Sequence, residues 1–153
     1  MTFDPQIVEI EPVHLAIIRE QIPLEEIGTL FDRAFRTMPE RVAAQGRQLT
    51  GAAYGLTFSR PTDTIDIAAG FPIDAPIDPE GDMVPFTTPG GTAARYEHHG
   101  AYDGLSDAYG QLFAWLEREG LTPGPVMWEI YVTEPSPEAD PADMITEITI
   151  PLA

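Results

Sequence analysis

A single acidic residue interrupts an apolar run in the C-terminal third of the chain. Glu129 lies within Val126–Val132, whose bulky apolar and aromatic residues are typical of a buried β-strand. A carboxylate that is removed from water costs several kcal/mol unless a partner compensates it. A bound cation is one such partner. The run is therefore compatible with a pocket for an apolar, positively charged molecule.

The alternation of side chains along a strand leaves a second interpretation of Glu129 open. One face of the strand would carry Met127, Glu129, Tyr131 and Thr133. The other face would be wholly apolar and carry Val126, Trp128, Ile130 and Val132. Glu129 can then be an exposed residue of the sheet, since acids are seldom buried without partners. The apolar face can be core or a contact between two copies of the chain.

The composition is typical of one globular domain. The chain has 153 residues, 43% of them hydrophobic, which suits a core of its own. No apolar stretch approaches the ~20 residues of a membrane-spanning helix, and no signal peptide is visible. Cysteine is absent, which excludes disulfides and thiolate chemistry. We expect a single cytoplasmic domain over residues 1–153 without a cofactor.

The chain is strongly acidic. Its formal net charge is −17, and its 8 basic residues are all arginines. Direct binding of nucleic acid requires a basic face that neutralises phosphates, and the sequence has no basic cluster. A negative field attracts cations to a cleft, although solubility alone also explains such a charge. We therefore expect small-molecule partners, and neither nucleic acid nor a membrane.

Two segments have the three-and-four spacing of apolar residues that predicts amphipathic helices. The first runs from Pro23 to about residue 45 and is stopped by Gly46. Pro39 lies inside it and predicts a kink or a break. The second runs from Tyr102 to about residue 119 and is stopped by Gly120.

Strand patterns surround both helices. They cover residues 13–19, 52–58, 64–71, 92–98, 126–133 and 144–150, with a candidate edge strand at 7–10 and a short strand at 82–87. The order strand–helix–strand–strand thus occurs twice, with short connections. We expect an α+β fold in which duplicated modules form one antiparallel sheet, with two helices on one side and a central cleft.

The two modules keep the same spacing in the sequence. Three pairs of residues lie 74 positions apart: Gly46 and Gly120 (120 − 46), Pro61 and Pro135, and Tyr54 and Trp128. We interpret this as an internal duplication, with repeats at about 6–72 and 82–152 joined by a segment rich in Pro, Asp and Gly. At the same offset Gly55 matches Glu129. A glycine opposite the acid leaves space near the axis that relates the repeats.

Other motifs do not support a metal or a nucleophilic site. His98 and His99 are neighbours in a predicted strand and point to opposite faces, so they cannot bind one ion. Gly104–Ala108 resembles a nucleophile elbow but lies in a predicted helix. Pro89–Thr92 lacks the lysine of a phosphate loop. The acids of Pro137–Asp143 lack the ligand spacing of a calcium loop. We expect no metal.

Aromatic residues accompany Glu129 in both repeats. The candidates for a ligand pocket around it are Tyr54, Tyr96, Trp128 and Tyr131 on strands, and Phe35, Met38 and Tyr109 on helices. Aromatic walls with one acid attract lipophilic cations by stacking, cation–π contact and charge. An aromatic stripe at helical spacing is more often core, however. The parity of the strand also places Trp128 opposite Glu129.

Several segments together carry a resemblance to a known family. They are 89–94 (PGGTAA), 99–105 (HGAYDGL), Tyr109, Leu112, Trp115, Leu116, Gly120, 129–131 (EIY) and 149–152 (TIPL). With them the chain, from about Gln6 to Leu152, resembles the GyrI-like small-molecule-binding domains. These are also known as the effector-binding domains of AraC-type and MerR-type multidrug regulators.

The resemblance implies a pocket between the two helices. In it, Glu129 of the E-x-Y motif would contact cationic aromatic ligands, with Tyr131 beside it. Family members are often fused to a DNA-binding domain, for which this chain has no room, so we expect a stand-alone form. Such forms are described as drug-binding proteins connected with antibiotic resistance, as a gyrase inhibitor, and as hydrolases that open cyclopropane rings of DNA-alkylating drugs.

Three functions therefore compete. The first is a stand-alone binding protein for lipophilic, often cationic aromatic molecules, which the acid among aromatics favours. The second is a cyclopropane hydrolase in which Glu129 activates water with the help of Tyr131 or Tyr96; burial would raise the pKa of the acid toward that of a useful base. The third is an acidic protein that acts on a nucleic-acid enzyme such as gyrase, motivated by the net charge.

Overall fold

The strands and helices follow the order that the sequence predicts. A computed structural model describes residues 4–58, 62–101, 104–132, 140 and 144–153. The elements are β1 (Gln6–Ile10), β2 (His14–Pro23), the 3-10 turn η1 (Leu24–Glu26), α1 (Ile27–Ala44), β3 (Tyr54–Thr57), β4 (Thr64–Pro72), β5 (Met83–Thr87), β6 (Gly91–His99), α2 (Leu105–Arg118), β7 (Met127–Tyr131) and β8 (Ile145–Pro151). The expected ends at Tyr102 and Thr133, the pair Pro61 and Pro135, and the acidic segment 137–143 except Asp140 lie outside the described residues.

All the strands belong to one open antiparallel sheet, as expected for the α+β fold. Their order is β1-β6-β8-β7-β3-β4-β2-β5. The sheet has two halves that meet where β3 pairs with β7. In that pair Gly55 lies directly opposite Glu129, with Tyr54 opposite Ile130 and Leu56 opposite Trp128. Residues 74 apart in the sequence are therefore related by a local two-fold axis through the pair Gly55–Glu129.

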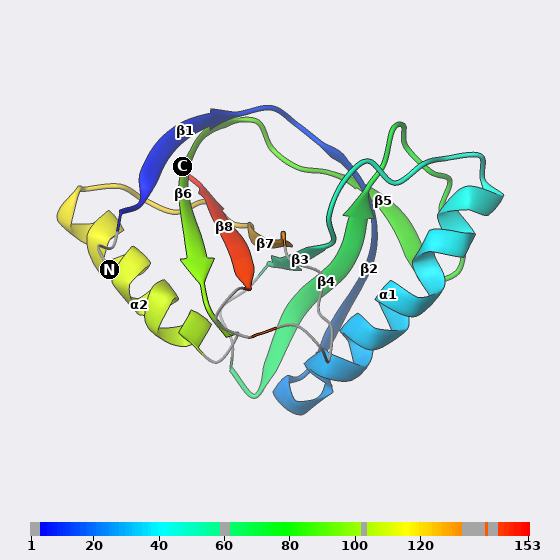
Figure 1. Cartoon of the computed structure of the whole chain (residues 1–153), viewed down its shortest axis with the longest axis horizontal. Helices are drawn as coiled ribbons and strands as arrows, with labels where there is room; N and C mark the ends of the chain where they lie inside the picture. Colours follow the sequence, from blue (N-terminus) through cyan, green and yellow to red (C-terminus); the bar gives the residue numbers. More distant parts are fainter. Residues whose placement is uncertain (1–3, 59–61, 102–103, 133–139, 141–143) are drawn as a thin grey trace.

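The two edge strands, β1 and β5, are exchanged between the halves of the sheet. Each pairs with a strand of the other repeat. β1 precedes β2 but pairs with β6, and β5 precedes β6 but pairs with β2. The connecting segments cross between the halves side by side, as Figure 1 shows at the top of the view. There the Thr88 amide donates to the Val13 carbonyl and the Val13 amide donates to the Thr88 hydroxyl, both at 2.9 Å. The crossing ties the two halves together.

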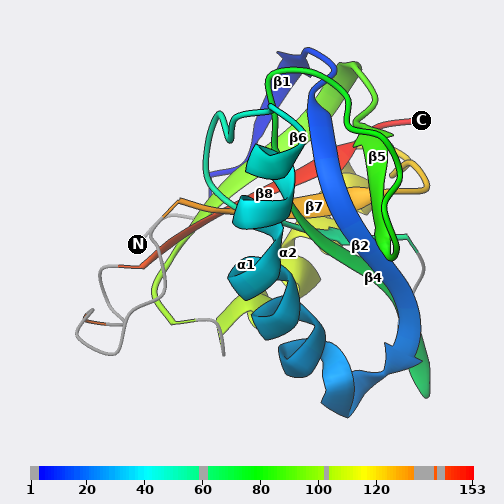
Figure 2. The ribbon, with the colours of Figure 1, turned by 90° about the vertical axis from the view of Figure 1, so that its right-hand side faces the viewer.

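Cross-strand partners show that both helices cover the same face of the sheet. One row of paired residues runs across seven strands: Tyr96, Ile148, Glu129, Gly55, Ala69, Ile18 and Met83. Paired residues point to one face. α1 packs against the Ala69–Met83 end of this row and α2 against the Ile148 end. The helices lie on the two flanks of the molecule, with β3 and β7 between them (Figure 1). In the view from the α1 side, α1 lies in front and α2 lies at the back (Figure 2).

The opposite face of the sheet carries a second apolar core. It consists of Leu15, Ile17, Tyr54, Leu56, Ala68, Val126 and Trp128. Trp128 is 4% exposed and Val126 6%. Val126, immediately before β7, and Trp128, within it, are therefore core residues of the chain itself. Val132, beyond the end of the strand, is 50% exposed.

Both helices end in the same way, at glycines with left-handed backbones. Gly46 has a φ of 73° and Gly120 a φ of 69°. After α1, the Arg47 amide donates to the Val42 carbonyl and the Gly46 amide to the Ala43 carbonyl. The equivalent bonds follow α2, from Leu121 to Leu116 and from Gly120 to Glu117. Each helix therefore closes in a Schellman motif, which glycine favours because it has no Cβ.

A kink or a break was expected at Pro39. The break is wrong, because α1 is one helix from Ile27 to Ala44 with Pro39 inside it, and the kink stays a prediction. An internal proline costs roughly 3 kcal/mol through a lost hydrogen bond and a steric clash. Met38 and Val42 are fully buried on either side of it. Each such side chain contributes about 1.5–3 kcal/mol of burial, which outweighs the cost.

Candidate functional site

A cleft lies over β3 and β7, between the two helices. Its volume is about 1190 Å³. One wall is α2 with the loop that follows it, the other is the N-terminal part of α1, and the floor is formed by β3, β4 and β7. The lining residues are Ile27, Phe31, Gly55, Thr57, Phe58, Ile65, Ile67, Ser106, Tyr109, Phe113, Leu116, Glu117, Leu121, Thr122, Pro123, Gly124, Pro125, Met127, Glu129 and Tyr131. Such a cleft is large enough for a drug-sized molecule.

Glu129 lies on the floor of the cleft and is held by two phenol groups. The Tyr109 hydroxyl, from α2, donates to Glu129 Oε2 at 2.6 Å. The Tyr131 hydroxyl, from the same strand as the acid, donates to Glu129 Oε1 at 3.0 Å. Each carboxylate oxygen therefore has one donor and retains accepting capacity for a ligand. The acid is partly buried, not free in bulk solvent.

The electrostatics of this group favour a positive ligand. Burial raises the pKa of the Glu129 carboxyl, and the hydrogen bonds from Tyr109 and Tyr131 and the charge of His98 oppose that rise. Burial and the adjacent carboxylate also raise the pKa of Tyr109, which stays a neutral donor. Among the described residues that line the cleft, two are acids and none is basic. A cation can therefore compensate the desolvated carboxylate, and the protein places no competing cation in the lining.

Gly55 provides the space in which the Tyr131 hydroxyl lies. A Cβ built on Gly55 would lie less than 3.0 Å from that hydroxyl and 3.0 Å from Phe31 Cζ. Any other residue at this position would push the phenol away from Glu129. The glycine opposite the acid, which the repeat offset predicts to leave space, is thus in direct contact with the site.

Aromatic rings form both sides of the cleft near the acid. On the α1 side, Phe31 lies 5.6 Å from Phe35 and 6.1 Å from Tyr131, between ring centroids. On the α2 side, Tyr109 and Phe113 are stacked, with centroids 6.2 Å apart and planes inclined by 23°. These faces suit an aromatic cation, because an aromatic ring attracts positive charge to its face.

The residues predicted around Glu129 divide into three groups. Tyr109 and Tyr131 line the cleft with Glu129. Phe35 lies behind the lining, 6.2 Å from Tyr131, while Met38 is fully buried under α1 and Tyr96 packs under α2. Tyr54 and Trp128 lie in the core on the opposite face of the sheet. The parity of the strand indicates this position for Trp128, and Tyr54 follows from its place beside Gly55 in β3.

Several lining residues were not predicted from the sequence. Phe31 and Phe113 lie on the apolar stripes of the helices, four residues from Phe35 and Tyr109 respectively. The spacing of three and four could have suggested them, but it does not separate a residue that faces the cleft from one that faces the core. Met127 also lines the cleft, and the alternation along the strand predicts it on the same face as Glu129.

The local two-fold axis relates polar groups in one repeat to apolar or small ones in the other. At the offset of 74, Glu129 corresponds to Gly55, Tyr109 to Phe35 and Tyr131 to Thr57. The carboxylate and both of its phenol donors therefore come from the second repeat. The first repeat contributes space and apolar rings. The site is asymmetric although it lies on the axis of the sheet.

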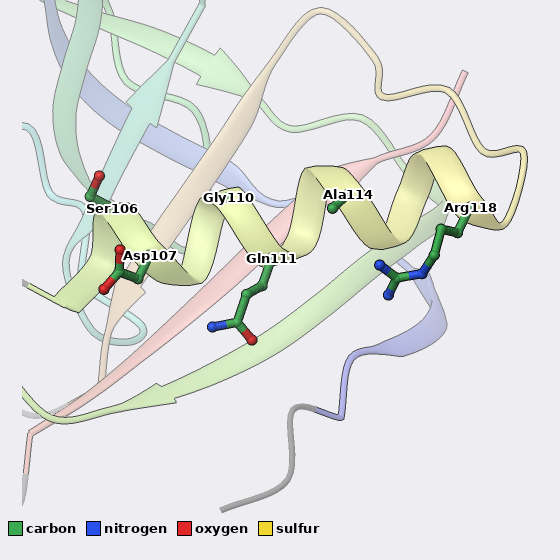
Figure 3. A pocket seen from close by; sticks show the side chains of 6 residues that line it. All are labelled: Ser106, Asp107, Gly110, Gln111, Ala114 and Arg118. Atoms are coloured by element: carbon green, nitrogen blue, oxygen red, sulfur yellow. The ribbon is translucent and has the colours of Figure 1, made fainter.

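A second, smaller hollow lies along another side of α2. It has a volume of about 500 Å³ and is lined by Ser106, Asp107, Gly110, Gln111, Ala114 and Arg118. Figure 3 shows Gln111 and Arg118 extending from the same side of the helix. The lining of this hollow has no aromatic residue and includes both an acid and a base, so it lacks the features that suit a lipophilic cation.

Metal-binding clusters and membrane-spanning helices can be judged over the described residues. No group of three or more His, Asp or Glu side chains in this part of the chain is placed to hold a metal ion. No helix among the same residues is long and apolar enough to cross a membrane.

Comparison with known proteins gives a family match and a set of similar folds. Residues 3–153 match the family described as the GyrI-like small molecule binding domain. A search of curated protein sequences found no significant match. The crystal structure of the EcmrR C-terminal domain is similar, with 23% identity, a TM-score of 0.86, and coverage of 100% of this chain and 99% of that chain.

Three further comparisons involve longer or more distant chains. EcmrR in a complex with DNA has 22% identity and a TM-score of 0.84, and the match covers 98% of this chain but only 57% of that one. SAV2435 bound to tetraphenylphosphonium has 14% identity and a TM-score of 0.68, with coverage of 98% and 94%. A hydrolase from Listeria innocua has 12% identity and a TM-score of 0.64, with coverage of 97% and 91%. At these identities the likeness establishes the fold.

Proposed function

The chain belongs to the GyrI-like small-molecule-binding domains, and on that premise we propose that its cleft binds lipophilic, cationic aromatic molecules. Glu129 is the group that selects positive charge. Tyr109 and Tyr131 orient its carboxylate, and Phe31 and Phe113 offer ring faces to the ligand.

One observation carries this proposal. The Glu129 carboxylate lies on the floor of a cleft in which the described lining contains two acids, several aromatic rings and no basic residue. Its hydrogen bonds come from neutral hydroxyls, so its negative charge is solvated but not neutralised. A desolvated charge of this kind gains most from a ligand of opposite charge.

The comparison with SAV2435 supports the same chemistry. That protein, which has a similar fold over 98% of this chain, was solved with tetraphenylphosphonium, a lipophilic aromatic cation. The low identity means that the ligand is a guide to the class of molecule and not to its contacts here.

A dye-binding titration tests the proposal. Rhodamine 6G, a cationic aromatic fluorophore, is titrated with the wild type, with Glu129→Gln and with Glu119→Gln. The last variant removes the same charge from an exposed position at the end of α2. Glu129→Gln should weaken binding by about 1–3 kcal/mol, the scale of a hydrogen bond or contact to a charged group. Equal affinities for the two variants would remove Glu129 from the mechanism.

A second candidate function is hydrolysis of an electrophilic cyclopropane. The specific observation in its favour is the raised pKa of Glu129 beside two phenol hydroxyls. In this reaction the carboxylate accepts a proton from water, and the water oxygen bonds to a ring carbon. The ring C–C bond breaks, and its electron pair moves to a conjugated carbonyl that a phenol proton can stabilise.

Product analysis separates the two functions. An activated cyclopropane is incubated with the wild type and Glu129→Gln, and the ring-opened, hydrated product is measured by mass spectrometry. Multiple turnovers that disappear in the variant would establish the hydrolase. Saturable binding without product would rule out the hydrolase and support the binding function.

A further inference from the structure

The cleft contains a second carboxylate, Glu117, which lies on α2 eight residues after Tyr109. α2 presents Tyr109, Phe113 and Glu117 to the cleft at intervals of four residues. Residues four apart lie on one face of a helix, and eight residues rise about 12 Å along its axis. Tyr109 is hydrogen-bonded to Glu129. The strip of α2 formed by Tyr109, Phe113 and Glu117 therefore has an acid near each end.

The strip between the two acids is aromatic. Tyr109 and Phe113 are stacked with centroids 6.2 Å apart. Phe113 is 38% exposed, one of the large apolar side chains that the described structure leaves open to solvent. An exposed aromatic side chain one helical turn from a carboxylate is an arrangement that suits flat cations.

The end of the cleft near Glu117 is firmly built. The loop that follows α2 starts with the bond from the Leu121 amide to the Leu116 carbonyl. The Gly124 amide then donates to the Pro151 carbonyl of β8 at 2.7 Å. Leu121 and Gly124 both line the cleft. Glu117, an exposed residue near the end of α2, therefore lines the cleft together with a loop that these two hydrogen bonds hold.

We propose that the preferred ligands of the cleft are elongated dications, with one aromatic cation at Glu129 and a second at Glu117 and Phe113. This inference rests on the proposed function and adds to it a ligand class and a specificity-determining residue. An apolar linker between the two cations would lie along the strip of α2 that carries Tyr109 and Phe113. A monocation of the same length would fill the same volume but leave Glu117 without a partner.

The test compares matched ligands and matched variants. The ligands are a bis(quinolinium)alkane, in a series of linker lengths, and an N-alkylquinolinium monocation of equal length. Dissociation constants are measured by calorimetry for the wild type, Glu117→Gln, Glu119→Gln and Glu129→Gln. Glu119→Gln removes the same charge two residues further along and controls for the field of the acidic chain.

The dication should bind the wild type about three- to fivefold more tightly than the monocation, the scale of a partly exposed ion pair, and one linker length should be best. Glu117→Gln should reduce this preference, while Glu119→Gln keeps it. An equal preference in the two variants would overturn the inference, and the proposed function would stand if Glu129→Gln still weakened the monocation. If Glu129→Gln left the monocation unchanged, the proposed function would fail, and the inference with it.

Discussion

Replacement of Gly55 by alanine perturbs the site through a single methyl group. The new Cβ would lie less than 3.0 Å from the Tyr131 hydroxyl, a distance that real Cβ atoms essentially never show, and a tight 3.0 Å from Phe31 Cζ. The hydroxyl must therefore move, and its 3.0 Å bond to Glu129 Oε1 lengthens or breaks.

The expected magnitude combines opposing effects. Overpacking costs about 1–3 kcal/mol, and a lost hydrogen bond to an ionised group about 1.5–3 kcal/mol. These two costs overlap, since one movement of Tyr131 relieves the clash and breaks the bond. Replacement of a glycine in a strand by alanine by itself stabilises the folded state by about 0.5–1 kcal/mol. We expect Gly55→Ala to lower the free energy of unfolding by about 2 kcal/mol.

A double-mutant cycle with Tyr131→Phe isolates the cause. The Tyr131→Phe variant would lack the hydroxyl that clashes with the new Cβ, and with it the hydrogen bond to Glu129 that the clash would break. In the Tyr131→Phe background, Gly55→Ala should lower the free energy of unfolding by less than in the wild type, with a difference of about 1 kcal/mol or more, because only the close contact with Phe31 remains. Unfolding free energies come from urea titrations of the four proteins.

Gly110→Ala provides the control, because a Cβ there meets nothing within 4 Å. It lies within α2, where alanine should stabilise the protein by up to about 1 kcal/mol. If Gly55→Ala and Tyr131→Phe prove additive within about 0.5 kcal/mol, the two residues are not coupled and the reasoning is refuted.

Three other perturbations test the same site and the end of helix α2: Tyr109→Phe, a change of pH, and Gly120→Ala. Tyr109→Phe removes the donor at 2.6 Å and should lower the free energy of unfolding by about 1–3 kcal/mol at neutral pH and by less at acid pH, which urea titrations at the two pH values would check. Affinity for a permanent cation should be full above the raised pKa of Glu129 and decline as pH falls through it, and calorimetry should find that this decline is missing in Glu129→Gln. Because the folded-state pKa is raised, the wild type should also lose stability relative to Glu129→Gln as pH rises from about 4.3 through the raised value. Gly120→Ala should cost about 1–2 kcal/mol in thermal unfolding, since its φ of 69° is left-handed and a Cβ there has no clash to add.

Much of the fold was predictable because its signals are local. The glycines that end both helices need left-handed backbones, and Gly46 and Gly120 have them. The alternation along β7 placed Glu129 and Tyr131 on one face and Trp128 on the other, and the structure agrees. Such patterns depend on residues a few positions apart. They do not require knowledge of what packs above them.

The break expected at Pro39 was wrong for the complementary reason. The cost of an internal proline is a local property, whereas the burial of Met38 and Val42 depends on β2 and β4 below α1. Tertiary packing outweighed the local preference.

The site itself was only partly predictable. The acid and Tyr131 follow from one short motif, but the hydrogen bond from Tyr109 joins residues on different elements. Whether an aromatic residue faces the cleft or the core depends on how far each helix lies from the axis. Phe31 lines the cleft, while Phe35, one turn later on the same helix, lies behind it. Spacing alone does not distinguish these positions.

The most direct test of the central claim uses two ions of nearly equal size and shape but opposite charge. Calorimetry would compare tetraphenylphosphonium and tetraphenylborate on the wild type, Glu129→Gln and the control Glu119→Gln. If the Glu129 carboxylate selects positive charge, the wild type and the control should bind the phosphonium and reject the borate. Glu129→Gln should lose affinity for the phosphonium and narrow the difference between the two ions. An unchanged difference in Glu129→Gln would contradict the account.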